Sequence, residues 1–140
     1  MRVLVADDHD LVRETIAAFL AAEAEAEVVT AGNLGDALDQ VALRGAFDLV
    51  LLDYNMPGMN GLDGLSKMRA ANGGKPVAIL SGTATRALAE EVLSAGAAGF
   101  VPKTLASKSM VSAARFMAAG EVYAPFQLVR DRDEAAADLL

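Results

Sequence analysis

The chain has 140 residues and a mass of 14.5 kDa, with no cysteine and with 12 basic against 19 acidic side chains. This length fits one domain with a single core, and the missing cysteines exclude disulfides and thiolate metal sites. The net charge of -7 argues against direct nucleic-acid binding, and the short apolar runs argue against a membrane span or signal peptide, so we expect a cytoplasmic protein.

Short apolar runs alternate along the chain with longer segments of helical periodicity. The runs predict strands at Val3–Ala6, Glu27–Ala31, Phe47–Leu52, Pro76–Leu80 and Gly99–Val101. The periodic segments predict helices around residues 12–20 and through Leu34–Leu43, Leu62–Ala70, Ala87–Leu93 and Met110–Met117. Strands and helices in alternation are typical of the α/β class, so the sequence predicts a doubly wound parallel sheet of five strands flanked by five helices.

Polar residues are expected to mark the ends of the helices. Asp10 is the predicted N-cap of the first helix, whose apolar stripe of Val12, Ile16, Phe19 and Leu20 is assigned to the core. Glycines are predicted to stop the helices, and they stand at Gly45, Gly73, Gly74, Gly96 and Gly120.

Chemically active side chains follow four of the five predicted strands. Asp7 and Asp8 follow the first strand, Asp53 the third, Ser81 the fourth and, after one proline, Lys103 the fifth. Because ligand sites of open parallel sheets lie beyond the carboxyl ends of the strands, these five side chains are expected to converge. Taken singly, each has a structural explanation as a cap, a turn former or a surface charge; together they predict a site.

Three clustered carboxylates repel one another unless a cation intervenes. Oxygen ligands with vacant positions suit Mg2+, which keeps waters and shares phosphate oxygens. A hydroxyl at Ser81 and an ammonium at Lys103 add donors for the remaining phosphoryl oxygens. A carboxylate that acts as nucleophile in such a site forms an aspartyl-phosphate.

Four motifs in order, "VLVADDHDLVR", "DLVLLDYNMPGMNGL", "AILSGTA" and "AGAAGFVPK", closely resemble the receiver domain of bacterial two-component response regulators. The resemblance covers about residues 1–120 and implies the flavodoxin-like receiver fold with strand order 2-1-3-4-5. Residues 121–140 would then form a linker or an extra helix, which Pro125 can start at its first turn.

The resemblance implies a role for each site residue. Asp53 would accept the phosphoryl group of a sensor histidine kinase or phosphotransfer protein, and would also be a metal ligand. Asp8 would bind Mg2+ directly, Asp7 mostly through water, and Asn55 through its backbone carbonyl. The protein would therefore be a signalling module that assists its own phosphorylation and dephosphorylation rather than an enzyme with a separate substrate.

The same resemblance implies how the signal is read. Ser81 and Lys103 would hold the phosphoryl oxygens, and Ser81 with Phe100 would form the conformational switch. The "GFVPK" and "GEVYAP" segments look most like the NarL/LuxR type, whose output is transcription. A homodimer is expected on phosphorylation, and the kinase is expected to dock on an exposed apolar patch of Leu11, Thr104 and Leu105.

Some alternatives remain open. Thr104 follows Lys103 where the family often has proline, so the isomer of that bond is undecided. His9 is expected to be an exposed loop residue beside the site. The last twenty residues are too few for a helix-turn-helix domain, so the chain is either a receiver cut at its linker or a stand-alone receiver. A dehalogenase-type phosphatase would need an acid at Asn55, and a nucleotide carrier would need a glycine-rich loop in place of Asp7 and Asp8.

Overall fold

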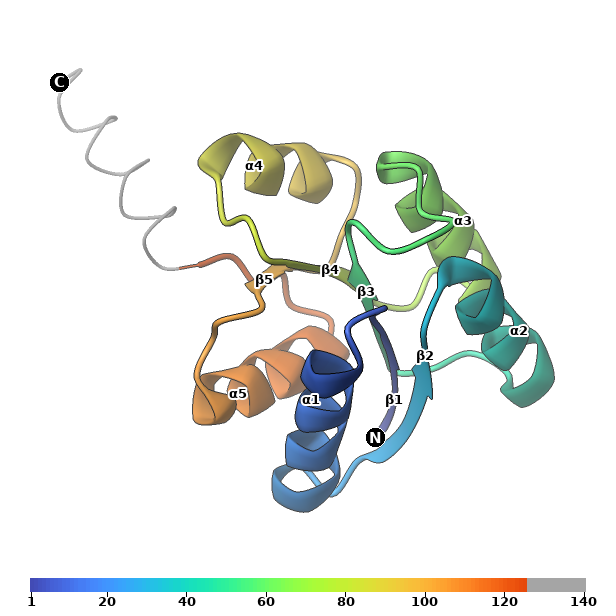
Figure 1. The fold of residues 1–140 in the computed structure, drawn as a ribbon, viewed down its shortest axis with the longest axis vertical. Coiled ribbons are helices and arrows are strands. Elements are labelled where there is room, and N and C mark those ends of the chain that lie inside the picture. Colours follow the sequence, from blue (N-terminus) through green and yellow to red (C-terminus); the bar gives the residue numbers. More distant parts are fainter. Residues whose placement is uncertain (126–140) are drawn as a thin grey trace, which may run out of the picture.

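A computed structural model describes residues 1–125 of the chain. Its elements, in chain order, are β1 (Arg2–Ala6), α1 (Asp10–Glu23), β2 (Glu27–Ala31), α2 (Leu34–Arg44), β3 (Leu49–Asp53), α3 (Leu62–Ala71), β4 (Val77–Ser81), α4 (Arg86–Ser94), β5 (Phe100–Pro102) and α5 (Ser107–Ala118). All strand pairs are parallel, and the order is β2-β1-β3-β4-β5 (Figure 1). The predicted fold class and strand order are confirmed.

Helices cover both faces of the sheet, which explains the nearly continuous apolar strands. Every residue of β3 and β4 is buried. One core layer packs beneath α2, α3 and α4 and includes Phe47 and Phe100; the other packs beneath α1 and α5 and includes Leu20 and Met110. Figure 1 shows α1 and α5 side by side across the sheet from α3 and α4.

Two of the polar residues expected to follow the strands, Asp53 and Ser81, are the last residues of the strands themselves. Asp53 pairs with Leu80, and Ser81 pairs with Pro102, so both are fixed by the ladder rather than carried on a loop. Their side chains are therefore held at a rigid edge of the sheet. Such placement suits a site that must keep its geometry.

Two predictions about α1 are wrong. His9, not Asp10, is the N-cap; Asp10 is the first helical residue, and its carboxylate pairs with Arg13 at 2.9 Å. Phe19 is 37% exposed, because Ile16 and Leu20 already fill the contact with the sheet. Phe19 lies instead at the rim between α1 and α5, where it lines a surface hollow.

The glycines expected to end helices can be compared with the structure at Gly45 and Gly120. Gly45 follows α2 with φ 83°, and Gly120 follows α5 with φ 99°, so both end their helices in a conformation that side chains rarely adopt. The Lys103–Thr104 bond is trans. Among residues 1–125 no helix is long and apolar enough to cross a membrane. The helix predicted to start at Pro125 lies outside the described residues.

Candidate functional site

The carboxyl ends of β1 and β3 bring three aspartates together. Asp7 follows β1 with an exposed fraction of 0%, Asp53 closes β3 at 1%, and Asp8 lies beside them at the surface. One ligand atom from each of these aspartates and from His9 lies within 4.8 Å of the others. The predicted convergence of acids from two separate strands is confirmed.

Lys103 lies between the two buried carboxylates. Its Nζ atom is 3.0 Å from Asp7 Oδ2 and 3.0 Å from Asp53 Oδ2, and its side chain is 11% exposed. The backbone N–H of Lys103 donates to the carbonyl oxygen of Ser81 at 2.9 Å, which ties the end of β5 to the end of β4. One ammonium thus faces two buried carboxylates, with Asp8 beside them.

The protein environment separates the acidities of the two buried aspartates. Burial, together with the nearby Asp7 charge, raises the pKa of Asp53 despite the pairing with Lys103. Burial also opposes ionisation of Asp7, but the hydrogen bond from the His9 backbone N–H and the ion pair with Lys103 outweigh it and lower the pKa of Asp7. Asp53 is therefore the carboxylate whose negative charge is least satisfied by its own protein.

His9 lies beside the acidic cluster, as expected. Its side chain is 63% exposed as expected, yet its Nδ1 atom lies 3.0 Å from Asp7 Oδ1, 3.3 Å from Asp8 Oδ1 and 3.7 Å from Asp53 Oδ2. The same atom is 3.1 Å from Lys103 Nζ. Its place next to Asp8 in the chain was the only signal in the sequence for this contact.

The acidic cluster fits a hard divalent cation. The Oδ2 atoms of Asp7 and Asp53 are buried and receive no hydrogen bond within the described part of the chain, although Lys103 supplies charge to both. Buried oxygens without donors are those that a metal or water would satisfy. Carboxylates predominate in the set, which suits Mg2+, and the exposed His9 ring can turn away from it.

Ser81 and Asn55 lie at the same edge. The Ser81 hydroxyl, 1% exposed, donates to the carbonyl oxygen of Thr83 at 2.8 Å and accepts from the Thr83 N–H at 3.0 Å. The Asn55 backbone N–H donates to Asp53 Oδ1 at 3.3 Å. The Ser81 hydroxyl is thus held by its own loop, which must rearrange before it can reach a group on Asp53.

Phe100, the predicted switch aromatic, is wholly buried. Its ring belongs to the core layer beneath α4, together with Ala89 and Val92 of that helix. A ring in this place contacts the helix that a switch would move. Its role as a switch stays a prediction.

Comparison with known proteins identifies the class. The family model for the response regulator receiver domain matches residues 3–115. The chain therefore belongs to the response regulator receiver domain family, whose members are phosphoacceptor signalling modules. An acidic cluster like that of Asp7, Asp8 and Asp53 is typical of the magnesium site of receivers.

The curated relatives include a metabolism activator and a response regulator. The chain is 35% identical over 130 residues to the glycerol metabolism activator of Pseudomonas putida, covering 92% of this chain and 59% of that protein. It is 32% identical over 123 residues to the response regulator UvrY of Escherichia coli K12, covering 88% and 56%. It thus spans less than two thirds of these curated relatives.

Solved structures agree with this placement. The receiver domain of the putative response regulator NarL from Mycobacterium tuberculosis matches with a TM-score of 0.77 and 33% identity, over 86% of this chain and 97% of that chain. A LuxR-family response regulator from Aurantimonas matches with a TM-score of 0.84 and 25% identity, over 97% of both chains. The receiver is therefore of the NarL/LuxR kind.

Proposed function

We propose that Asp53 accepts a phosphoryl group from the phosphohistidine of a sensor kinase or phosphotransfer protein. The observation that carries this proposal is the 3.0 Å contact of Asp53 Oδ2 with Lys103 inside a cluster that holds Asp7 and Asp8. Asp53 combines burial, a fixed place on β3 and an oxygen whose counter-charge, Lys103, is shared with Asp7. These are the properties that a carboxylate nucleophile requires.

The transfer exchanges one phosphorus bond for another. An Asp53 oxygen forms a bond to phosphorus while the phosphorus–nitrogen bond to the donor histidine breaks, and the imidazole leaves with the bonding electron pair. Lys103 already contacts the accepting oxygen and remains as the counter-charge of the product. Ser81 donates its hydroxyl to a phosphoryl oxygen after releasing Thr83.

Mg2+ would be held by Asp8, Asp53 and the carbonyl oxygen of Asn55, with Asp7 acting through water. When bound, it neutralises charge on the phosphoryl oxygens during transfer. The buried Oδ2 atoms of Asp7 and Asp53, which share one ammonium between them, support this assignment. The exposed Asp8 carboxylate leaves the cluster open to solvent on one side.

The test is labelling by a small acyl-phosphate donor in the presence of Mg2+. The wild-type protein should gain one phosphoryl group by mass spectrometry, and Asp53→Ala should gain none. Asp48→Ala is the matched control, since Asp48 follows a different loop at the opposite edge of the sheet. Equal labelling of the wild type and Asp53→Ala would refute the assignment.

Phosphorylation is proposed to alter the face made by α4, β5 and α5. Drawing the Ser81 hydroxyl toward the phosphoryl group pulls the loop before α4 inward, and Phe100 lies against that helix. Phe100→Ala should label nearly as well as wild type and lose the change in amide shifts on α4. A wild-type response in that variant would make Phe100 an ordinary core residue.

The proposed kinase surface lies between α1 and the chain after β5. A hollow of about 350 Å3 is lined there by Leu11, Phe19 and Leu105, among others, and Leu11 is 81% exposed. It adjoins Lys103, so a partner seated in it can bring its phosphohistidine to the site. An exposed apolar patch next to a reactive group is typical of an interface.

This surface can be separated from the chemistry. Leu11→Glu combined with Leu105→Glu should slow transfer from the cognate kinase about tenfold or more and spare labelling by the small donor. Leu43→Glu is the control, because Leu43 is 77% exposed on α2. Equal loss with both donors would indicate damaged folding rather than lost docking.

The output is proposed to be transcription, through a DNA-binding domain outside this chain. The relatives are longer than this chain, and residues 121–140 would then be the linker that follows a receiver of residues 1–120. The alternative is a stand-alone receiver that signals by protein contact in the cytoplasm. Neither reading gives this acidic chain a direct contact with nucleic acid.

A homodimer is proposed for the phosphorylated state, since two-fold pairing is the commonest assembly. Sedimentation with and without beryllofluoride, a phosphoryl mimic, tests it. The dimer should form only with the mimic. A monomer mass in both states, well above micromolar concentration, would reject dimerisation by this chain.

A further inference from the structure

The chain after α5 returns to the sheet and pairs with the outer edge of β5. The Tyr123 N–H donates to the carbonyl oxygen of Ala98 at 2.9 Å, and the Phe100 N–H donates to the carbonyl oxygen of Tyr123 at 3.1 Å. Gly99 and Tyr123 form a parallel bridge. β5 is thus held on one side by β4 and on the other by the segment that leaves the domain.

A glycine makes this close approach possible. A Cβ atom on Gly99 would lie 2.9 Å from the Tyr123 carbonyl oxygen and 3.1 Å from Tyr123 Cβ. It would also lie 2.5 Å from the sulfur of Met117, which is the flexible end of a side chain. Any larger residue at Gly99 would therefore push the Tyr123 backbone away from β5.

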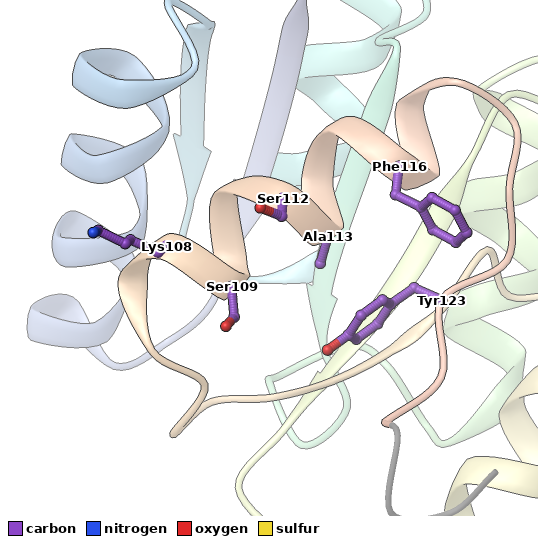
Figure 2. A pocket seen from close by; sticks show the side chains of 6 residues that line it. All are labelled: Lys108, Ser109, Ser112, Ala113, Phe116 and Tyr123. Carbon is purple, nitrogen blue, oxygen red and sulfur yellow. The ribbon is translucent and has the colours of Figure 1, made fainter.

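The Tyr123 ring anchors the segment to α5. Figure 2 shows the ring beside Ala113 and Phe116, on one side of the helix. These residues line a surface hollow of about 480 Å3, and the ring packs against the core layer beneath α1 and α5. Tyr123 is therefore held by its backbone at β5 and by its ring at α5.

This paired residue is connected to the candidate site by a short chain of contacts. Phe100 bonds to Tyr123; three positions later Lys103 bonds through its N–H to Ser81 and through its Nζ to Asp53. Both hydrogen bonds of Tyr123 go to β5 and its flanking residue, and neither goes to α5. A shift of β5 would therefore pull on the backbone of Tyr123, while the ring stays against α5.

We propose that Tyr123 is a positioning residue that transmits movement of β5 on phosphorylation to the chain that follows the receiver. The proposal rests on the proposed function of Asp53, because that reaction supplies the movement. The Tyr123 pairing converts a change at the phosphorylation site into a change at the start of the linker. A linker that left α5 without touching β5 would receive no such signal.

The experiment compares amide NMR spectra of the full 140-residue chain with and without beryllofluoride and Mg2+. In the wild type, the amides of Ser81, Phe100 and Tyr123 should all shift. In Gly99→Ala, Ser81 should still shift and Tyr123 should not. Without the mimic, the Phe100 amide of Gly99→Ala should exchange with solvent about fivefold faster, as the loss of one hydrogen bond requires.

Two side-chain variants complete the test. Tyr123→Ala removes the ring that holds the segment in place, so the amide of residue 123 should no longer shift. In Val122→Ala, at a residue 61% exposed, the Tyr123 amide should still shift. A Tyr123 amide that stays unchanged while Ser81 shifts would overturn the proposal and leave the function of Asp53 intact. A full response in Gly99→Ala would also overturn it. If the Ser81 amide failed to shift in the wild type, both the proposed function of Asp53 and the proposed role of Tyr123 would be refuted.

Discussion

The amino ends and the carboxyl ends of the parallel strands form two opposite edges of the sheet. Both edges carry aspartates paired with a lysine, but the pairs differ in burial. At the amino edge, the Asp48 carboxylate accepts from the Arg2 backbone N–H at 2.8 Å and pairs with Lys75 at 3.6 Å, partly exposed. At the carboxyl edge, Asp7 and Asp53 are buried around one lysine, and each keeps an oxygen without a hydrogen bond. The Asp48 carboxylate thus has its hydrogen bond and its counter-charge within the protein. The two buried carboxylates share one lysine, so they have room for a further cation.

The pKa values of Asp48 and Asp53 are shifted in opposite directions. A hydrogen bond from the Arg2 backbone lowers the pKa of Asp48, with help from the charge of Lys75. Burial raises the pKa of Asp53. A negative charge thus stabilises the fold at Asp48 and opposes it at Asp53. Charge kept against stability is a mark of function, and substitutions of these two aspartates should have opposite effects on stability.

The largest expected effect is on metal binding. Asp7→Asn combined with Asp8→Asn should weaken Mg2+ affinity about 100-fold or more, because two carboxylates leave the cluster. Titration calorimetry or fluorescence measures it. Asp48→Asn, which changes the other edge, should bind Mg2+ as wild type does. Unchanged affinity in the double variant would place the metal elsewhere.

The next largest effect is on the free energy of unfolding when Lys103 or Lys75 is replaced. Lys103→Met leaves two buried carboxylates without a counter-charge, so the free energy of unfolding without metal should fall by about 2 kcal/mol, and labelling should be poor. Lys75→Met should cost about 0.5 kcal/mol or less, since its pair is half exposed and screened. Urea denaturation at pH 7 compares them. Similar losses at both edges would remove the contrast.

A smaller effect of opposite sign is expected at Asp53. Because the folded pKa lies above the ordinary value of 3.8, the stability contributed by this group is complete below that value and is lost as the pH rises through the folded pKa. Asp53→Asn should therefore stabilise the metal-free protein by about 1 kcal/mol at pH 7. The gain should disappear near pH 3.8. Destabilisation at pH 7 would contradict the raised pKa.

The smallest effect belongs to Asp48. Its folded pKa is lowered, so its contribution is present above 3.8 and is lost as the pH falls through the folded value. Asp48→Asn should destabilise by about 0.5 kcal/mol or less at pH 7, because the group is partly exposed. Thermal unfolding across pH 3 to 7 would show the difference closing in acid. A stabilising change would break the contrast with Asp53.

Much of this molecule could be predicted from its sequence because two signals are strong in it. Strand and helix periods alternate clearly, and parallel strands bring their carboxyl ends to one edge, so the meeting of Asp7, Asp53 and Lys103 followed from topology alone. The predicted ends of the third and fourth strands, Leu52 and Leu80, are each one residue too early, because a polar residue after an apolar run indicates the start of a loop.

The differences have two physical causes. Phe19 was assigned to the core because it is apolar and falls on the stripe, but Ile16 and Leu20 are the buried residues of α1 and Phe19 is 37% exposed. The contacts of the His9 ring with the acids and the pairing of Tyr123 with β5 depend on where a short loop turns in space. Periodicity and composition carry no information on such turns, so only a structure could place them.

The route of the chain through the sheet also bears on synthesis. Asp7 leaves the ribosome with the first strand and Lys103 only with the last, so the acids exist long before their counter-charge. A nascent chain that has not yet reached β5 lacks Lys103, the ammonium that contacts both Asp7 and Asp53 in the folded domain. The proposed phosphorylation of Asp53 therefore acquires its counter-charge only with the last strand of the sheet.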